Sequence, residues 1–305
     1  MRSERSAKGD RGGGMSEAND ATAMSGMSFG RGPTVKTLAL RIGSEPLGAK
    51  DETLPDSAIQ ILANDGVRSS APLVNMGDAS RAKVEIPNYG FYNASVTRKT
   101  VHGKFLDVQI AQAELLKGAM AHGGHSEHDP KLFKATMDDK APFELIREHG
   151  PDEKLWTTIR SGEKASFLVR SYGSPVAGAH VTLVSQEGWR KTLTTDANGR
   201  AEFTVIRDYF PDWADFNRRH SGVFLVWAEK ETPDAGVYDG HDYSATRYQA
   251  SLSGRYYPSP ADYESYGYGV GVVVFVTAFA GLSIWLFRQR RRKSFKEIVF
   301  NEKLA

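Results

Sequence analysis

The sequence predicts a mostly β protein made of two β-sandwich domains and one C-terminal transmembrane helix. Short runs rich in β-branched and aromatic residues, broken by Gly, Asn and Pro, recur from Pro33 to about Ser259, as in sandwich folds. A polar segment at 119–140 separates these runs into two groups. Near the end, Gly267 to Phe287 form 21 residues without a charge, which is long enough to cross the hydrocarbon core of a bilayer as a helix.

The first segment, residues 1–33, is rich in Gly, Ser, Met and charged residues. Such a composition cannot bury a core, so we expect a disordered leader. Residues 1–36 also contain no apolar run of the length found in a secretory signal peptide.

The first sandwich is expected at residues 34–118, where strand-like runs alternate between apolar and polar positions. A short helical turn is expected at 111–121, at the end of this domain. The predicted strands are 35–42, 58–62, 82–86, 90–96 and 105–111.

The second sandwich is expected at residues 141–259, with about seven strands, the number typical of immunoglobulin-like or transthyretin-like domains. The sequence Asp196-Ala197-Asn198-Gly199 lies between two of these strands. Asn and Gly tolerate positive φ, so we expect a tight hairpin there. The predicted strands are 155–159, 165–170, 179–185, 191–195, 201–205, 222–228 and 243–252.

Two stretches of the second sandwich carry a family resemblance. Gly173 to Val181 and Thr195 to Phe203 resemble the Gly-x-Pro and Thr-Asp-x-x-Gly patterns of carboxypeptidase-regulatory-like and bacterial surface immunoglobulin-like domains. Gly222 to Ala228, followed by an acidic turn and Tyr243 to Thr246, resembles bacterial extracytoplasmic nickel/cobalt-uptake accessory proteins. This resemblance covers roughly residues 141–257 and, loosely, 80–118. It implies a two-part β protein with a C-terminal membrane span, found beside a metal transporter.

The segment between the sandwiches, 119–140, contains the best candidate for a metal site. Its imidazoles and carboxylates are His122, His125, His128, Glu127 and Asp129. Neutral imidazole suits Ni, Co, Cu and Zn, and carboxylates can complete or orient the ligand shell. The alternative is a solvated linker in which the histidines are incidental.

The apolar span is predicted as a membrane helix at 260–287, followed by a basic tail at 288–305. The positive charges that follow it directly are Arg288, Arg290, Arg291, Arg292 and Lys293. Such clusters mark the cytoplasmic end of a span. We therefore expect the sandwiches on the outer side of the cytoplasmic (inner) membrane, and the C-terminus in the cytoplasm.

Small residues in the span follow a four-residue spacing, at Gly267 and Gly271 and again at Thr277 and Gly281. This spacing allows close helix packing in lipid, with a transporter subunit or with a second copy of the chain. The alternative is the ordinary use of glycine in membrane helices.

Composition limits the remaining function classes. The chain has 305 residues, no cysteine and a net charge of +2. The basic tail accounts for +5, because it holds seven Lys/Arg and two Asp/Glu, so +2 less +5 leaves −3 for the rest. A mildly acidic outer part without a basic stripe argues against nucleic-acid binding. No nucleotide-binding loop, nucleophile elbow or zinc-protease motif is found, so we expect no enzyme.

The leading hypothesis is a single-pass, membrane-anchored extracytoplasmic protein that acts as an accessory component in transition-metal handling or uptake. Its partners would be membrane lipid and a membrane protein, and its cofactor a divalent transition metal. The alternative is a non-catalytic structural or interaction subunit of a membrane complex, with no metal role.

Overall fold

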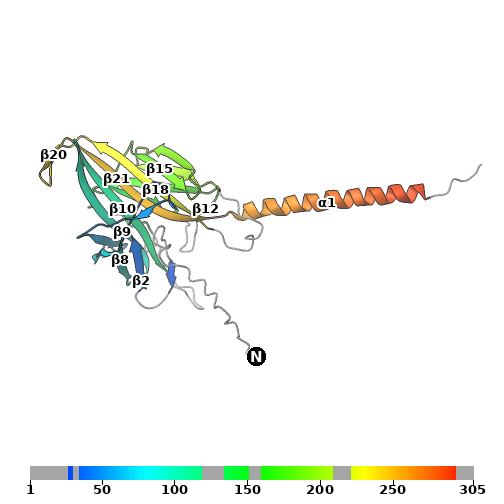
Figure 1. Cartoon of the computed structure of the whole chain (residues 1–305), viewed down its shortest axis with the longest axis horizontal. Coiled ribbons are helices and arrows are strands. Elements are labelled where there is room, and N and C mark those ends of the chain that lie inside the picture. Colours follow the sequence, from blue (N-terminus) through cyan, green and yellow to red (C-terminus); the bar gives the residue numbers. More distant parts are fainter. Residues whose placement is uncertain (1–26, 30–33, 119–133, 151–158, 209–220, 293–305) are drawn as a thin grey trace, which may run out of the picture. The chain divides into compact units, whose positions relative to one another are not determined.

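The computed structural model describes residues 27–29, 34–118, 134–150, 159–208 and 221–292. Contacts divide the chain into two compact units, Met1–Tyr257 and Pro258–Ala305. Strands make up the described part of the first unit, and one long helix lies in the second (Figure 1). The expectation of a mostly β chain with one apolar C-terminal helix is therefore confirmed.

The described residues of the first unit include a ten-stranded sheet, whose central strands run side by side as long arrows in Figure 1. Its strands, in spatial order, are β16 (Arg190–Thr194), β15 (His180–Ser185), β18 (Gly222–Thr232), β21 (Ala245–Tyr257), β10 (Phe105–Gly118), β9 (Gly90–His102), β5 (Ala58–Ala63) and β6 (Arg68–Pro72). Two short strands attach beside this path: β1 (Met27–Phe29) pairs with β10, and β12 (Ile159–Arg160) pairs with β21.

The two predicted sandwiches share this sheet. Strand β10, the last of the first predicted domain, pairs in parallel with β21, the last of the second. The pairing runs from Phe105 opposite Ala245 to Gln112 opposite Leu252. A division into two separate immunoglobulin-like sandwiches is therefore not confirmed, because backbone hydrogen bonds continue from one group of strands into the other.

Two smaller sheets cover opposite faces of the large one. One consists of β11 (Glu144–Glu148), β13 (Lys164–Ser171), β14 (Ser174–Pro175) and β17 (Arg200–Thr204). The other consists of β2 (Thr34–Ala39), β8 (Ala79–Ile86) and β7 (Val74–Met76). Side chains alternate between the two faces along a strand. On β10, Leu106 and Val108 accordingly join one core cluster, while Leu115 joins the other.

The core under the β11–β13–β17 layer is closed by aromatic side chains. The ring of Phe167 meets those of Phe203 and Phe224 edge-on, with centroids 6.0 and 6.1 Å apart. The Phe224 ring lies over Gly254, its register partner on β21, so closely that a Cβ at 254 would fall 2.3 Å from it. A bulky residue therefore requires a glycine across the ladder at this point.

Two local expectations were wrong. Residues 111–118 are not a helical turn, because β10 continues as a strand to Gly118. The turn at Asp196–Gly199 is not a hairpin, because β16 pairs with β15 while β17 pairs with β13. The turn carries the chain from the large sheet to the layer above it. Two short hairpins complete the described strands: β3 (Arg41–Ile42) with β4 (Lys50–Asp51), and β19 (Gly236–Tyr238) with β20 (His241–Tyr243).

The second unit contains α1 (Pro260–Arg291), with Gly267–Arg291 long and apolar enough to cross a membrane. These 25 residues would span about 37 Å at 1.5 Å per residue, which exceeds the roughly 30 Å of a bilayer core. Arg288, Arg290 and Arg291 occupy the last turn.

Candidate functional site

The predicted metal ligands His122, His125, His128, Glu127 and Asp129 lie outside the described residues. Within the described ranges, no group of three or more His, Asp or Glu side chains is placed to hold a metal ion. The metal site of the 119–140 segment therefore stays a prediction.

The predicted packing residues of the span, Gly267, Gly271, Thr277 and Gly281, all lie on α1. The Thr277 hydroxyl donates to the Val273 carbonyl oxygen, 2.8 Å away, so it is satisfied within its own helix. Of the predicted topology residues, Arg292 lies in the turn after the helix, and Lys293 lies outside the described residues.

An apolar hollow in the first unit lies on the face of the large sheet that carries the β2–β8–β7 layer. This open-face groove crosses β18, β21 and β10, and its volume is about 500 Å³. Its far wall is formed by the end of β2 and the segment that follows, including Leu38, Leu40 and Leu54. Ligand sites are commonly concave, mostly apolar and about 300 to 1,000 Å³ in volume.

Small side chains on the floor create this hollow. Trp227 of β18 lies opposite Ser251 of β21, and Ala111 of β10 lies opposite Val96 of β9. Half-buried positions of a sheet usually carry large β-branched or aromatic residues. Ser251 and Ala111 leave that space empty between Trp227 and the far wall.

The next position along each strand pair repeats the pattern. Leu225 lies opposite Ser253, and Ala113 lies opposite Ala94. All four line the groove. The hollow therefore extends along the strands, with aliphatic and aromatic side chains on β18 and small ones on β21 and β10.

A row of polar side chains crosses the sheet at the other end of the groove. Glu229, Gln249, Gln109 and Arg98 are register partners on β18, β21, β10 and β9. Gln249 donates to Glu229 at 2.9 Å, and Gln109 donates to Gln249 at 3.5 Å. Arg98 pairs with Glu52 at 3.1 Å. This row offers amide and carboxylate groups to a ligand, beside the apolar floor.

A second, more polar hollow of about 650 Å³ shares Gln109, Gln249 and Glu229 with the groove. Arg247 lies in it, with Asp107 at 3.8 Å and Glu231 at 3.6 Å. The two hollows therefore adjoin on the sheet, and we call them together the track. Its lining is mostly apolar at Leu225 and Trp227 and charged at Glu231 and Arg247.

A buried polar junction lies where residues 134–143 meet β6, β11 and β13. Glu144 is fully buried, and its Oε2 accepts a hydrogen bond from the Asp138 backbone N–H at 3.0 Å. Burial raises the pKa of Glu144 to about 7. Asp138 accepts two hydrogen bonds from the Arg68 guanidinium, at 2.6 and 2.8 Å, and this pairing lowers the pKa of Asp138.

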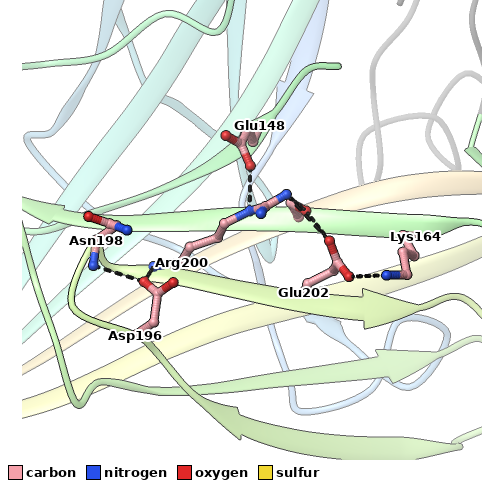
Figure 2. Close-up of polar contacts among 7 residues, drawn as sticks. Glu148, Lys164, Asp196, Asn198, Arg200 and Glu202 are labelled. Carbon is pink, nitrogen blue, oxygen red and sulfur yellow. Dashed lines mark hydrogen bonds and ion pairs between the residues drawn. The ribbon is translucent and has the colours of Figure 1, made fainter. Parts of the chain in front are cut away.

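The outer face of the β11–β13–β17 layer carries an ion-pair network (Figure 2). Arg200 reaches Glu148 at 2.7 Å and Glu202 at 3.3 Å, and Lys164 reaches Glu202 at 2.7 Å. The hydrogen bond from Lys164 lowers the pKa of Glu202. Arg200 and Lys164 are exposed, Glu148 and Glu202 are half-buried, and the charges match. These groups therefore tie three strands together and offer no reactive group.

The same view explains the Thr-Asp-x-x-Gly pattern. Asp196 Oδ1 accepts hydrogen bonds from the backbone N–H groups of Asn198 and Arg200, both at 2.9 Å (Figure 2). Gly199 has φ +73°, and a Cβ there would fall 2.5 Å from the Val169 carbonyl oxygen. The motif therefore has a structural role, because it shapes the crossing between the two sheets.

The open-face groove was missed at the sequence level, although a signal existed. Residues 222–228 are apolar at every position, which predicts a strand buried on both faces. In the structure Phe224 and Val226 face the core, whereas Leu225 and Trp227 are only half-buried and line the groove. An apolar strand beside a strand with serines at alternate positions, such as Ser251 and Ser253, is the pattern that indicates such a hollow.

No family model and no curated protein matches the chain. Among solved structures, a DUF4785 family protein from Legionella pneumophila is 8% identical over 66% of this chain, with a TM-score of 0.23. The BSP domain of a biofilm-associated protein is 9% identical over 64%, with a TM-score of 0.18. A pullulanase from Anoxybacillus sp. is 11% identical over 66%, with a TM-score of 0.19. The chain spans 48%, 24% and 23% of these proteins.

Proposed function

We propose that the chain is a single-pass, membrane-anchored and non-catalytic binding protein whose binding site is the open-face groove. One observation carries the proposal. Small residues, Ser251 and Ala111, stand on a sheet face where side chains would otherwise fill the space beside Trp227. A hollow of this kind reduces the apolar area that the chain can bury on its own, which a partner's side chains would restore.

The non-catalytic part of the proposal follows from the side chains of the groove. Its cations are matched by carboxylates, since Arg98 pairs with Glu52 and Arg41 with Asp51 at 3.4 Å. Its remaining polar groups are amides, hydroxyls and the carboxylates of Glu45 and Glu229. Such groups bind and orient a ligand, and the lining contains no pair of nucleophile and base.

The membrane part of the proposal follows from α1 and the charges at its end. Arg288, Arg290 and Arg291 close the helix, and positive charge at one end of a span favours the cytoplasmic side. The first unit would then lie outside the cytoplasmic membrane, and its groove would be available to another component of the cell envelope. A role in metal handling stays a prediction from the histidine segment and the family resemblance.

Filling the hollow tests the proposal. Ser251→Phe places a ring in the groove, and Ser70→Phe makes the same change on exposed β6, outside the groove. Both favour a strand locally, since Phe has a higher β-propensity than Ser. Full-length wild type and both variants are purified from their own membranes in mild detergent, and the co-purifying molecules are identified by mass spectrometry.

We expect one component that wild type and Ser70→Phe retain and that Ser251→Phe loses. If all three preparations contain the same co-purifying components, the proposal that the groove is the binding site is wrong.

A further inference from the structure

We propose, building on the groove as the binding site, that its occupant is an extended polypeptide segment. This segment presents two apolar side chains two residues apart and, two residues beyond the one that meets Trp227, a Lys or Arg; the segment can run in either chain direction along β18. The pattern is read from β18, whose groove-facing side chains are Leu225, Trp227 and Glu229 in order along the strand.

The length and period of the track favour an extended chain. From Leu225 to Glu231 the track covers six residue steps along β18, or about 20 Å at 3.4 Å per residue. Its chemistry changes at every second residue, because alternate side chains face the same side of a strand. An extended peptide lying along the strands has the same period, so its alternate side chains meet successive positions of the floor.

The apolar end sets the first two positions of the segment. Leu225 with Ser253, and Trp227 with Ser251, form two adjacent recesses that are apolar on β18 and small on β21. An aliphatic or aromatic side chain in each recess fills space that the chain leaves open. Anchors of this kind supply most of the affinity in peptide recognition, and the partner's backbone aligns them.

Charge sets the next position. The linings of the two hollows together hold four cations (Arg41, Arg98, Lys230 and Arg247) and five carboxylates (Glu45, Glu52, Asp107, Glu229 and Glu231), a net charge of −1. Arg98 and Arg247 are each paired with carboxylates, as described above. Glu229 is exposed, and among the described residues its hydrogen-bond partner is the Gln249 amide. A Lys or Arg two residues beyond the apolar pair would therefore meet a carboxylate that no cation of the described track neutralises.

The experiment selects the occupant directly. A display library of random heptapeptides is panned on the full-length chain in nanodiscs and counter-selected on Ser251→Phe. Ala111→Leu fills the same hollow from β10 and serves as a second counter-selector in case one variant folds poorly. A parallel selection uses Glu229→Lys, a change at an exposed position that reverses the charge beside the apolar floor.

We expect wild type to enrich sequences with apolar residues at i and i+2 and Lys or Arg at i+4, or the same pattern in reverse order. Glu229→Lys should enrich the same apolar pair with Asp or Glu in place of the Lys or Arg. A synthetic peptide carrying the wild-type consensus should bind Glu229→Lys about tenfold more weakly than wild type, as expected when one charge pair is reversed.

Enrichment without the two-residue period, enrichment that the filled variants share, or an unchanged charge preference in Glu229→Lys would overturn the inference. If no peptide is enriched while Ser251→Phe still loses its co-purifying component, the groove binds something other than an extended chain and the proposed function stands. If both experiments fail, both proposals fall.

Discussion

Replacing Glu144 by Gln should stabilise the protein at neutral pH. Glu144 lies on β11 with its carboxyl group fully buried. Its Oε2 accepts the Asp138 N–H, and its Oε1 has no hydrogen-bond partner among the described residues. Burial is the main cause that raises the pKa of Glu144 to about 7. The negative charge of Asp138 also raises this pKa, whereas the positive charge of Arg170 lowers it. Gln keeps the shape and the acceptor oxygen and cannot ionise.

The size of the effect follows from the pKa. A carboxyl group whose pKa is higher in the folded state binds its proton more tightly there, so raising the pH favours unfolding. The loss begins near the ordinary value of 4.5 and is complete just above pH 7. A difference of about 2.5 pKa units corresponds to about 3 kcal/mol of unfolding free energy at 1.36 kcal/mol per unit. Glu144→Gln and wild type should therefore differ by about 3 kcal/mol more at pH 8 than at pH 4.

Urea unfolding of the full-length chain in nanodiscs, followed by tryptophan fluorescence, measures this difference. Glu148→Gln on the same strand is the matched control, because Glu148 is only half-buried and already pairs with Arg200 at 2.7 Å. It should show little of the pH-dependent gain. Unfolding free energies that stay parallel for wild type and Glu144→Gln from pH 4 to pH 8 would refute the reasoning.

Three further predictions concern the groove, the histidine segment and the helix. Ser251→Phe should change the unfolding free energy by less than about 0.5 kcal/mol, because the ring enters a hollow. Ala250→Phe, on the packed opposite face of the same strand, should lower it by at least about 2 kcal/mol. Equal losses for the two variants in urea unfolding would contradict the presence of an open groove at Ser251. Calorimetric titration with Ni²⁺, Co²⁺, Cu²⁺ and Zn²⁺ should give heats that the triple change of His122, His125 and His128 to Ala removes; unchanged heats would exclude this segment as the site. Full-length protein should sediment with lipid vesicles, and a chain ending at Ser259 should not; equal sedimentation would show that residues 260–305 are not needed for membrane binding.

Strand positions could be predicted well because alternation and turn residues are local properties. The predicted runs 58–62, 165–170 and 201–205 agree with β5, β13 and β17 to within one residue at each end. Strand β11 (Glu144–Glu148) was not predicted, because charged residues at both of its ends interrupt the apolar pattern expected of a strand. Burial of a carboxyl group is a tertiary effect that composition does not reveal.

The sheet order could not be predicted in the same way. Pairing of β10 with β21 joins residues about 140 positions apart, and no local pattern specifies it. The groove depends on that pairing, since it brings Ala111 beside the strand that carries Ser251. At the Asp196–Gly199 turn, the local sequence predicts the turn itself but does not predict which sheets the two flanking strands join.

Hydroxyl-radical footprinting of Trp227 tests most directly whether the open-face groove is the binding surface. Oxidation of Trp227 is compared between native membranes and purified full-length chain, with Tyr172, which is 63% exposed, as the reference. The account predicts that Trp227 is protected in membranes, where its partner is present, and oxidised after purification, while Tyr172 reacts equally in both. Equal oxidation of Trp227 in the two preparations would contradict it.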